Sequence, residues 1–175
     1  MRGIVRDVAV LVLATVMGVG VVLAMSAEAA HPATGRSTAA QCTNDDLTAS
    51  YRGGDAATSH VYGRIVLKNT SDAACWVKGY GGLSYVGHGD GTQIGAAADR
   101  TPSKKPKTVL QPGDKVRSRV VETSTGPYDK KLCRPRHVDG FRVYVPDEIR
   151  SQFIPHETTG CANPDIHLIA HKAYR

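Results

Sequence analysis

The chain has 175 residues, of which 41% are hydrophobic and 22% charged, and its formal net charge at pH 7 is +6. These values are ordinary for a globular protein and differ from those of disordered or collagen-like chains. The length accommodates one domain and excludes a polytopic membrane protein. What remains is a small basic protein.

The N-terminal segment has the pattern of an export signal. Two arginines precede an uncharged apolar run from Val8 to Met25, and Ala27 and Ala29 form the A-x-A pattern of a cleavage site. We therefore expect a signal peptide over residues 1–29, cleaved near Ala29–Ala30, and a protein that is secreted or held in the cell envelope. The alternative is an uncleaved membrane anchor, because the run approaches the length that spans a bilayer.

The segment after the cleavage site differs in composition from the rest of the chain. Residues 30–41 are small, polar and interrupted by Pro and Gly, which predicts a flexible leader. We place the domain at residues 42–175. The four charges of residues 1–29 sum to zero, so the whole excess of +6 belongs to the exported part.

Four cysteines in an exported chain indicate two disulfides. Three pairings are possible, and the sequence alone does not choose among them. We prefer Cys42–Cys75 and Cys133–Cys161, because each would link nearby strand ends. A zinc site is the competing interpretation, but the cysteines contain no C-x-x-C pair and their gaps fit no compact metal motif.

The domain has the frequent turns and short alternating segments that are typical of a β protein. Short alternating segments are separated by turns such as Gly89-Asp90-Gly91 and Gln111-Pro112-Gly113-Asp114. We expect an all-β, immunoglobulin-like β-sandwich of about seven to eight strands. The strand segments lie at residues 47–51, 60–67, 75–77, 83–86, 109–110, 116–120, 141–145 and 166–170. The one weak helix candidate is Asp147 to Phe153, directly after Pro146.

Several motifs, in order, resemble a known family. They are Cys75-x4-Tyr80, Leu83-Ser84-Tyr85-Val86, Asp90-Gly91-x2-Ile94-Gly95, Leu110-x-Pro112-Gly113, Cys133-Arg134-Pro135, Gly140-Phe141-Arg142-Val143-Tyr144 and Cys161-Ala162-Asn163-Pro164. Together they resemble an exported actinobacterial domain-of-unknown-function family, forty-two thirty-two in the numbered series. The resemblance covers Cys42 to nearly the C-terminus and implies an exported, disulfide-bearing, immunoglobulin-like sandwich. Gly81 departs from it, because the family usually has proline there. The resemblance implies no activity, cofactor or catalytic residue.

Catalytic and metal-binding patterns are weak. His167 and His171 would share a helix face, but on a strand they would lie about 13 Å apart, too far for one ion. The sequence contains no nucleophile elbow, zincin motif or phosphate loop. We therefore predict a protein that is not an enzyme and that has no cofactor, metal site or catalytic residue.

The basic residues are the best functional signal. Lys115, Arg117 and Arg119 recur at period two, so on a strand they share one solvent-facing side. A second group, Lys104, Lys105 and Lys107, lies in a Pro-rich segment, and a third, with Arg134 and Arg136, lies beside Cys133. The three groups would form one cationic face if the strand that carries the first group lay between the segments that carry the other two. The candidate anion-binding residues are Lys104, Lys105, Lys107, Lys115, Arg117, Arg119, Arg134 and Arg136.

These observations predict a noncatalytic binding or interaction module of the cell envelope or extracellular space. Its expected partner is an anionic cell-envelope polymer or another exported protein, attracted by the basic face. No stacking aromatics interleave with the cations along the sequence, which disfavours a specific nucleic acid. A membrane partner follows only if the signal is uncleaved. The alternatives are an envelope hydrolase whose site is assembled only in the fold, and a structural spacer.

Overall fold

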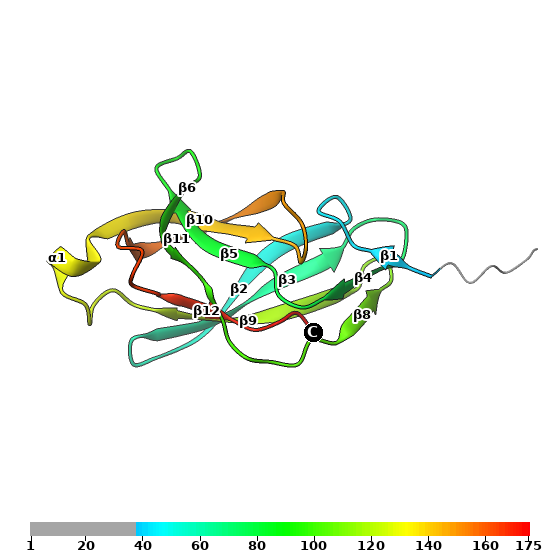
Figure 1. Ribbon diagram of the computed structural model, residues 1–175, viewed down its shortest axis with the longest axis horizontal. Helices are drawn as coiled ribbons and strands as arrows, with labels where there is room; N and C mark the ends of the chain where they lie inside the picture. The colour runs from blue at the N-terminus through cyan, green and yellow to red at the C-terminus, as the bar shows by residue number, and fades with distance from the viewer. Residues whose placement is uncertain (1–37) are drawn as a thin grey trace, which may run out of the picture. The chain divides into compact units, whose positions relative to one another are not determined.

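A computed structural model describes residues 38–175, and the expected signal peptide and most of the leader lie outside this range. Within it the chain forms twelve strands and one short helix, in three sheets. The all-β prediction is therefore confirmed, and two disulfides accompany it. Figure 1 shows the strands in order along the chain.

The first large sheet has five strands in the order β2-β3-β9-β12-β7. Their bounds are β2 Leu47–Ala57, β3 His60–Asn69, β9 Lys115–Thr123, β12 Ile169–His171 and β7 Asp99–Arg100. Strands β2 and β3 form an antiparallel hairpin, and β3 pairs antiparallel with β9, from which five other strands separate it in the chain. Alternation along β9 is strict, with Val116, Ser118 and Val120 buried and the residues between them exposed. This sheet carries the candidate site.

The second large sheet has four strands in the order β11-β10-β5-β6. Their bounds are β11 Ser151–Cys161, β10 Pro135–Tyr144, β5 Gly82–Gly87 and β6 Thr92–Ala97. A third, small sheet joins β1 Ala40–Gln41, β4 Cys75–Lys78 and β8 Lys107–Leu110. Strand β1 belongs to the segment that we expected as leader, so the folded domain begins slightly before Cys42.

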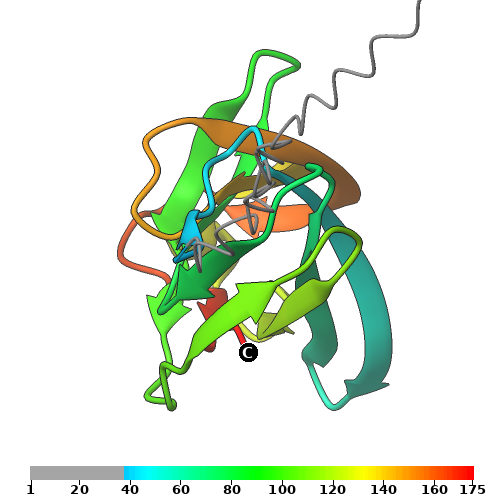
Figure 2. The same ribbon diagram turned by 90° about the vertical axis from the view of Figure 1, so that its right-hand side faces the viewer.

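The core lies between the two large sheets. Inward-facing residues of both sheets form it, and the large, fully buried members include Phe141, Ile65, Leu67, Val116 and Val138. Strand β11, orange in Figure 2, runs next to the cyan-to-teal β2, where one edge of each sheet meets the other. There Gln152 of β11 accepts a hydrogen bond from the backbone N–H of Ala49 and donates one to the carbonyl of Leu47.

The two preferred disulfide pairings are confirmed. Cys42–Cys75 joins the end of β1 to the start of β4, and Cys133–Cys161 joins helix α1, Lys130–Cys133, to the end of β11. The side chain of Asp129 caps this helix by accepting hydrogen bonds from the backbone N–H groups of Lys131 and Leu132. The sequence prediction did not include the helix, which is four residues long.

The one helix candidate of the sequence, Asp147 to Phe153, is not helical. Residues 147–150 form turns and bends, and from Ser151 the chain continues as the eleven-residue strand β11. Its register with β10 pairs Phe141 with Ile154 and Pro135 with Cys161. Pro155 makes this segment look unlike a strand, but β11 is an edge strand, where a residue without an N–H is tolerated.

Candidate functional site

The outer face of the five-stranded sheet carries a row of arginines. Backbone register places Arg52 of β2 opposite Arg64 of β3, and Arg64 opposite Arg119 of β9. All three side chains are exposed. Residues directly opposite each other on neighbouring antiparallel strands have Cβ atoms about 4.5–5.5 Å apart. Three cationic side chains therefore stand side by side across three strands.

Other cations extend this row along the same strands. Lys68 of β3 lies opposite Lys115 of β9, again with both side chains exposed. The C-terminal residues continue the sheet, because Arg117 and Arg175 exchange both backbone N–H to carbonyl hydrogen bonds, at 2.9 and 3.1 Å. The backbone N–H of Lys172 donates to the carbonyl of Arg119 at 3.0 Å. The C-terminal segment thus adds two cations to this face.

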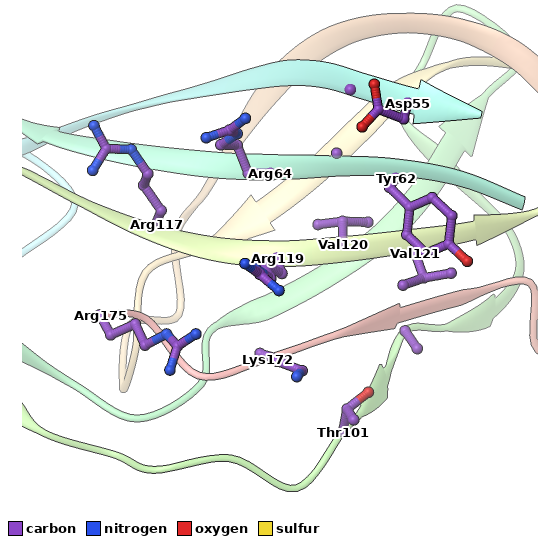
Figure 3. A pocket seen from close by; sticks show the side chains of 13 residues that line it. Asp55, Tyr62, Arg64, Thr101, Arg117, Arg119, Val120, Val121, Lys172 and Arg175 are labelled. Carbon is purple, nitrogen blue, oxygen red and sulfur yellow. The ribbon is translucent and has the colours of Figure 1, made fainter. Parts of the chain in front are cut away.

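This face contains a hollow of about 670 Å³. Its cationic wall consists of Arg64, Arg117, Arg119, Lys172 and Arg175, and we call these five residues and the space they line the arginine hollow. Figure 3 shows their side chains rising from β3, β9 and the C-terminal segment. Tyr174, fully buried next to Arg175, anchors that segment in the core.

Cationic side chains outnumber acidic side chains in the arginine hollow. The salt bridges within residues 38–175 involve none of its five cations. Asp55 is the one acidic side chain among the lining residues. Like charges directly opposite each other destabilise a sheet, so this arrangement costs stability unless an anion occupies it. A set of unpaired cations in a hollow is an arrangement that binds anions.

An aromatic side chain forms part of the same wall. Tyr62, two residues before Arg64 on β3, lines the hollow and is 44% exposed. Its register partner is Val121 of β9, which also lines the hollow. The site therefore offers a ring surface beside the guanidinium groups, although no aromatic lies within the β9 stripe itself.

The eight candidate residues do not gather on one surface. Lys115, Arg117 and Arg119 lie on β9 as their spacing indicates. Lys104, Lys105 and Lys107 lie in the approach to β8 and at its start, whereas Arg134 caps α1 and Arg136 is the second residue of β10. Figure 1 shows β8 and α1 at opposite ends of the sandwich. The single face joining all three groups is therefore not formed.

Two lysines in and before β8 contact aromatic rings. Lys107 Nζ lies 4.1 Å from the ring centre of Trp76, which is half-buried in β4. Lys105 Nζ lies 5.3 Å from the ring centre of Tyr80. These distances fit cation–π contacts, which stabilise the small sheet and its flanking loop. Lys105 also lines a second hollow, of about 420 Å³, where Asp147 and Glu148 oppose the cations.

Sequence reasoning missed five members of the cationic face, which are Arg52, Arg64, Lys68, Lys172 and Arg175. Arg64 lies in a predicted strand and alternates with buried Ile65, so its outward direction was readable. Its position opposite Arg119 depends on the register between β3 and β9, which no local pattern specifies. The approach of Arg175 to Arg117 depends on where the C-terminal segment packs.

A buried polar cluster crosses the core on the inner side of the same sheet. Glu122 of β9 is 5% exposed and accepts hydrogen bonds from the hydroxyls of Tyr51 and Tyr85, both at 2.6 Å. His156 Nε2 lies 2.8 Å from Oε2 of Glu122, and its ring stacks on Phe141 at 4.6 Å between ring centres. Tyr51 and Glu122 belong to the five-stranded sheet, and Tyr85 and His156 belong to the four-stranded sheet.

The hydrogen bonds decide the charge of Glu122. Burial by itself would raise the pKa of this carboxyl, but the hydrogen bonds from His156, Tyr51 and Tyr85 outweigh it and hold the pKa below its usual value. Burial and the neighbouring carboxylate raise the pKa of both tyrosine hydroxyls. Glu122 is therefore an anion that joins the two sheets.

A second histidine is buried without a carboxylate. His171 Nδ1 lies 3.2 Å from Ser118 Oγ, and the rings of His171 and Tyr80 make a T-shaped contact. Burial, with a smaller effect from the charge of Arg100, lowers the pKa of His171 to about 4. His171 is neutral in the folded protein at ordinary pH.

His–carboxylate pairs do occur, but they lie outside the two hollows described above. Glu122 and His156 line neither hollow, and neither does the pair of His167 and Asp99, whose side chains approach to 2.8 Å on the surface. Residues 38–175 also contain no group of three or more His, Cys, Asp or Glu residues placed to hold a metal ion.

Comparison with known proteins agrees with the motifs. The family model of the domain of unknown function DUF4232 matches residues 42–169. The chain belongs to the DUF4232 family. No curated protein and no solved structure matches it. Within the described range, this DUF4232 member has no helix with the length and apolarity needed to cross a bilayer.

Proposed function

We propose that this DUF4232 protein is an exported, noncatalytic binding module that engages an anionic polymer of the cell envelope through the arginine hollow. The observation that carries the proposal is the register of Arg52, Arg64 and Arg119, which places three exposed cations directly opposite one another. Such a row opposes folding, so its presence is better explained by ligand binding than by stability.

The form of the site favours a polymer over a small, deeply enclosed ligand. The cations extend over several strands, from Lys68 and Lys115 through Arg64 and Arg119 to the C-terminal segment. A chain of negative charges can contact such a surface at several points, and each contact adds to the attraction. Two disulfides support an oxidising location outside the cytoplasm, where envelope polymers are accessible.

Cosedimentation with the producing cell's envelope fraction, at low and high salt, tests the proposal. Wild-type protein is expected to sediment with the envelope at low salt and to remain in solution at high salt, because salt screens exposed charges. The variant R64A/R119A should lose most of this binding. The matched control K130A/K131A removes the same charge from helix α1 and should bind like wild type.

The two variants separate a site from general electrostatic attraction. Equal loss of binding in both would contradict the arginine hollow as the site, and salt-independent binding would contradict the electrostatic mechanism. Envelope binding that disappears after protease treatment of the envelope would indicate another exported protein as the partner instead of a polymer.

A further inference from the structure

From the composition of the arginine hollow we infer a specificity, which rests on the proposed function: the hollow recognises tetrahedral oxyanions, phosphate or sulfate groups of a polymer, in preference to carboxylates. The inference concerns the chemical class of the anion. It depends on which cations line the hollow and on how the sheet spaces them.

The cations of the hollow are mainly arginines. Four of its five are arginine, and Lys172 is the exception. Of the other two basic groups, the one before and at the start of β8 is all lysine, at Lys104, Lys105 and Lys107, whereas the one around α1 is mixed. A lysine ammonium is a compact charge that attracts any anion, whereas a guanidinium presents a rigid fork of N–H donors suited to oxyanions. The arginines thus supply directional donors as well as charge.

The sheet holds these donors at regular spacing. Arg64 and Arg119 are directly opposite across β3 and β9, and Arg117 and Arg175 are opposite at the next outward position. Outward-facing residues on one strand are about 6.5–7 Å apart, and opposite residues are about 5 Å apart. Long arginine side chains on this grid reach a common anion from more than one strand.

The number of acceptor directions separates the two classes of anion. A carboxylate has two oxygens whose acceptor directions lie in one plane, and a guanidinium fork pairs with both oxygens from within that plane. The oxygens of a phosphate or sulfate group project in several directions around a tetrahedral centre, so two or more guanidiniums from different strands can donate to the same group. The grid in the arginine hollow therefore fits the tetrahedral anion better, although its charge attracts both.

The test replaces guanidinium groups by ammonium groups, which changes the geometry of the hydrogen-bond donors and keeps the charge. Titration calorimetry would compare wild type with R64K/R117K/R119K, using inorganic polyphosphate, dextran sulfate and poly-L-glutamate of similar length as probes. Wild type is expected to bind a tetrahedral polyanion about tenfold or more tightly than polyglutamate, since tenfold corresponds to about 1.4 kcal/mol, the size of one charge-assisted hydrogen bond. The lysine variant should lose this preference and still bind all three weakly.

The control and the possible outcomes distinguish a preference for tetrahedral anions from anion binding in general. K130R/K131R, which adds guanidinium groups on α1, should leave the wild-type preference unchanged. Preference for polyphosphate alone would assign phosphate, and preference for dextran sulfate alone would assign sulfate. Equal affinity for all three probes in wild type and lysine variant overturns the inference but keeps anion binding. Binding to no probe overturns the proposed function as well.

Discussion

His156 and Glu122 are joined across the two sheets, with Nε2 of the histidine 2.8 Å from Oε2 of the carboxylate. Tyr51 and Tyr85 donate to the same carboxylate from strands of different sheets. The outer side of the five-stranded sheet carries the arginine hollow, and its inner side is joined to the opposite sheet through Glu122. The cluster therefore fixes the strand β9 from which Arg117 and Arg119 project.

Replacing Glu122 by glutamine should destabilise the protein by about 2–4 kcal/mol, because a buried charge network loses the anion that its three donors face. The free energy of unfolding, measured by urea denaturation near neutral pH, checks this. The pKa of Glu122 is lower in the folded protein than its value of 4.5 in the unfolded chain. The ionised carboxylate therefore contributes its full stabilisation above pH 4.5, and this stabilisation is lost as the pH falls through the lower pKa of the folded state. Exposed Glu157 on β11 provides the control E157Q, expected to change stability by less than about 0.5 kcal/mol. Equal effects of the two substitutions would contradict the role of the cluster.

Acid should destabilise the protein through His171 at higher pH than through Glu122. Its pKa falls from 6.5 in the unfolded chain to about 4 in the fold, so the unfolded state takes up a proton first as pH falls. At about pH 5 this costs roughly 2 kcal/mol relative to neutral pH. Unfolding free energies measured across this range should fall less steeply in H171N than in wild type. The same slope in both proteins would show that His171 titrates normally.

Removing the bridge between Cys133 and Cys161 should cost about 3–4 kcal/mol, as the chain-entropy model gives for a loop of this length. The comparison is C133A/C161A against wild type in urea, with reductant absent. Peptide mapping under non-reducing conditions should recover Cys42 linked to Cys75 and Cys133 linked to Cys161. Peptides that link Cys42 to Cys133 or Cys161 would contradict the connectivity described here.

Local patterns predicted the fold class well because the strands that form the core alternate cleanly. Strand β9 is the clearest case, with Val116, Ser118 and Val120 inward and Lys115, Arg117 and Arg119 outward. Strand β11 escaped prediction because Pro155 interrupts it and because its pairing with β10 supplies the order that its sequence does not show. The helix candidate Asp147 to Phe153, which overlaps the start of β11, is not helical for the same reason, since a favourable first turn does not outweigh an available strand partner.

The candidate site was only partly predictable. Its β9 residues follow from alternation, but the opposition of Arg64 and Arg119 follows from strand register, and that of Arg117 and Arg175 from the packing of the C-terminus. Glu122 continues the inward series of β9, so its burial was readable from the same pattern. Its partners come from β2, β5 and β11, and only the assembled sandwich brings them together.

The measurement that tests the location of the site most directly is amide chemical-shift mapping by NMR during titration with inorganic polyphosphate. The account predicts that the largest shifts fall on Arg64, Arg117, Arg119 and the residues from Lys172 to Arg175. Smaller shifts are expected at Lys104–Lys107 and around Arg134–Arg136. Shifts concentrated in those two loops, or spread evenly over all basic residues, would contradict the arginine hollow as the binding site.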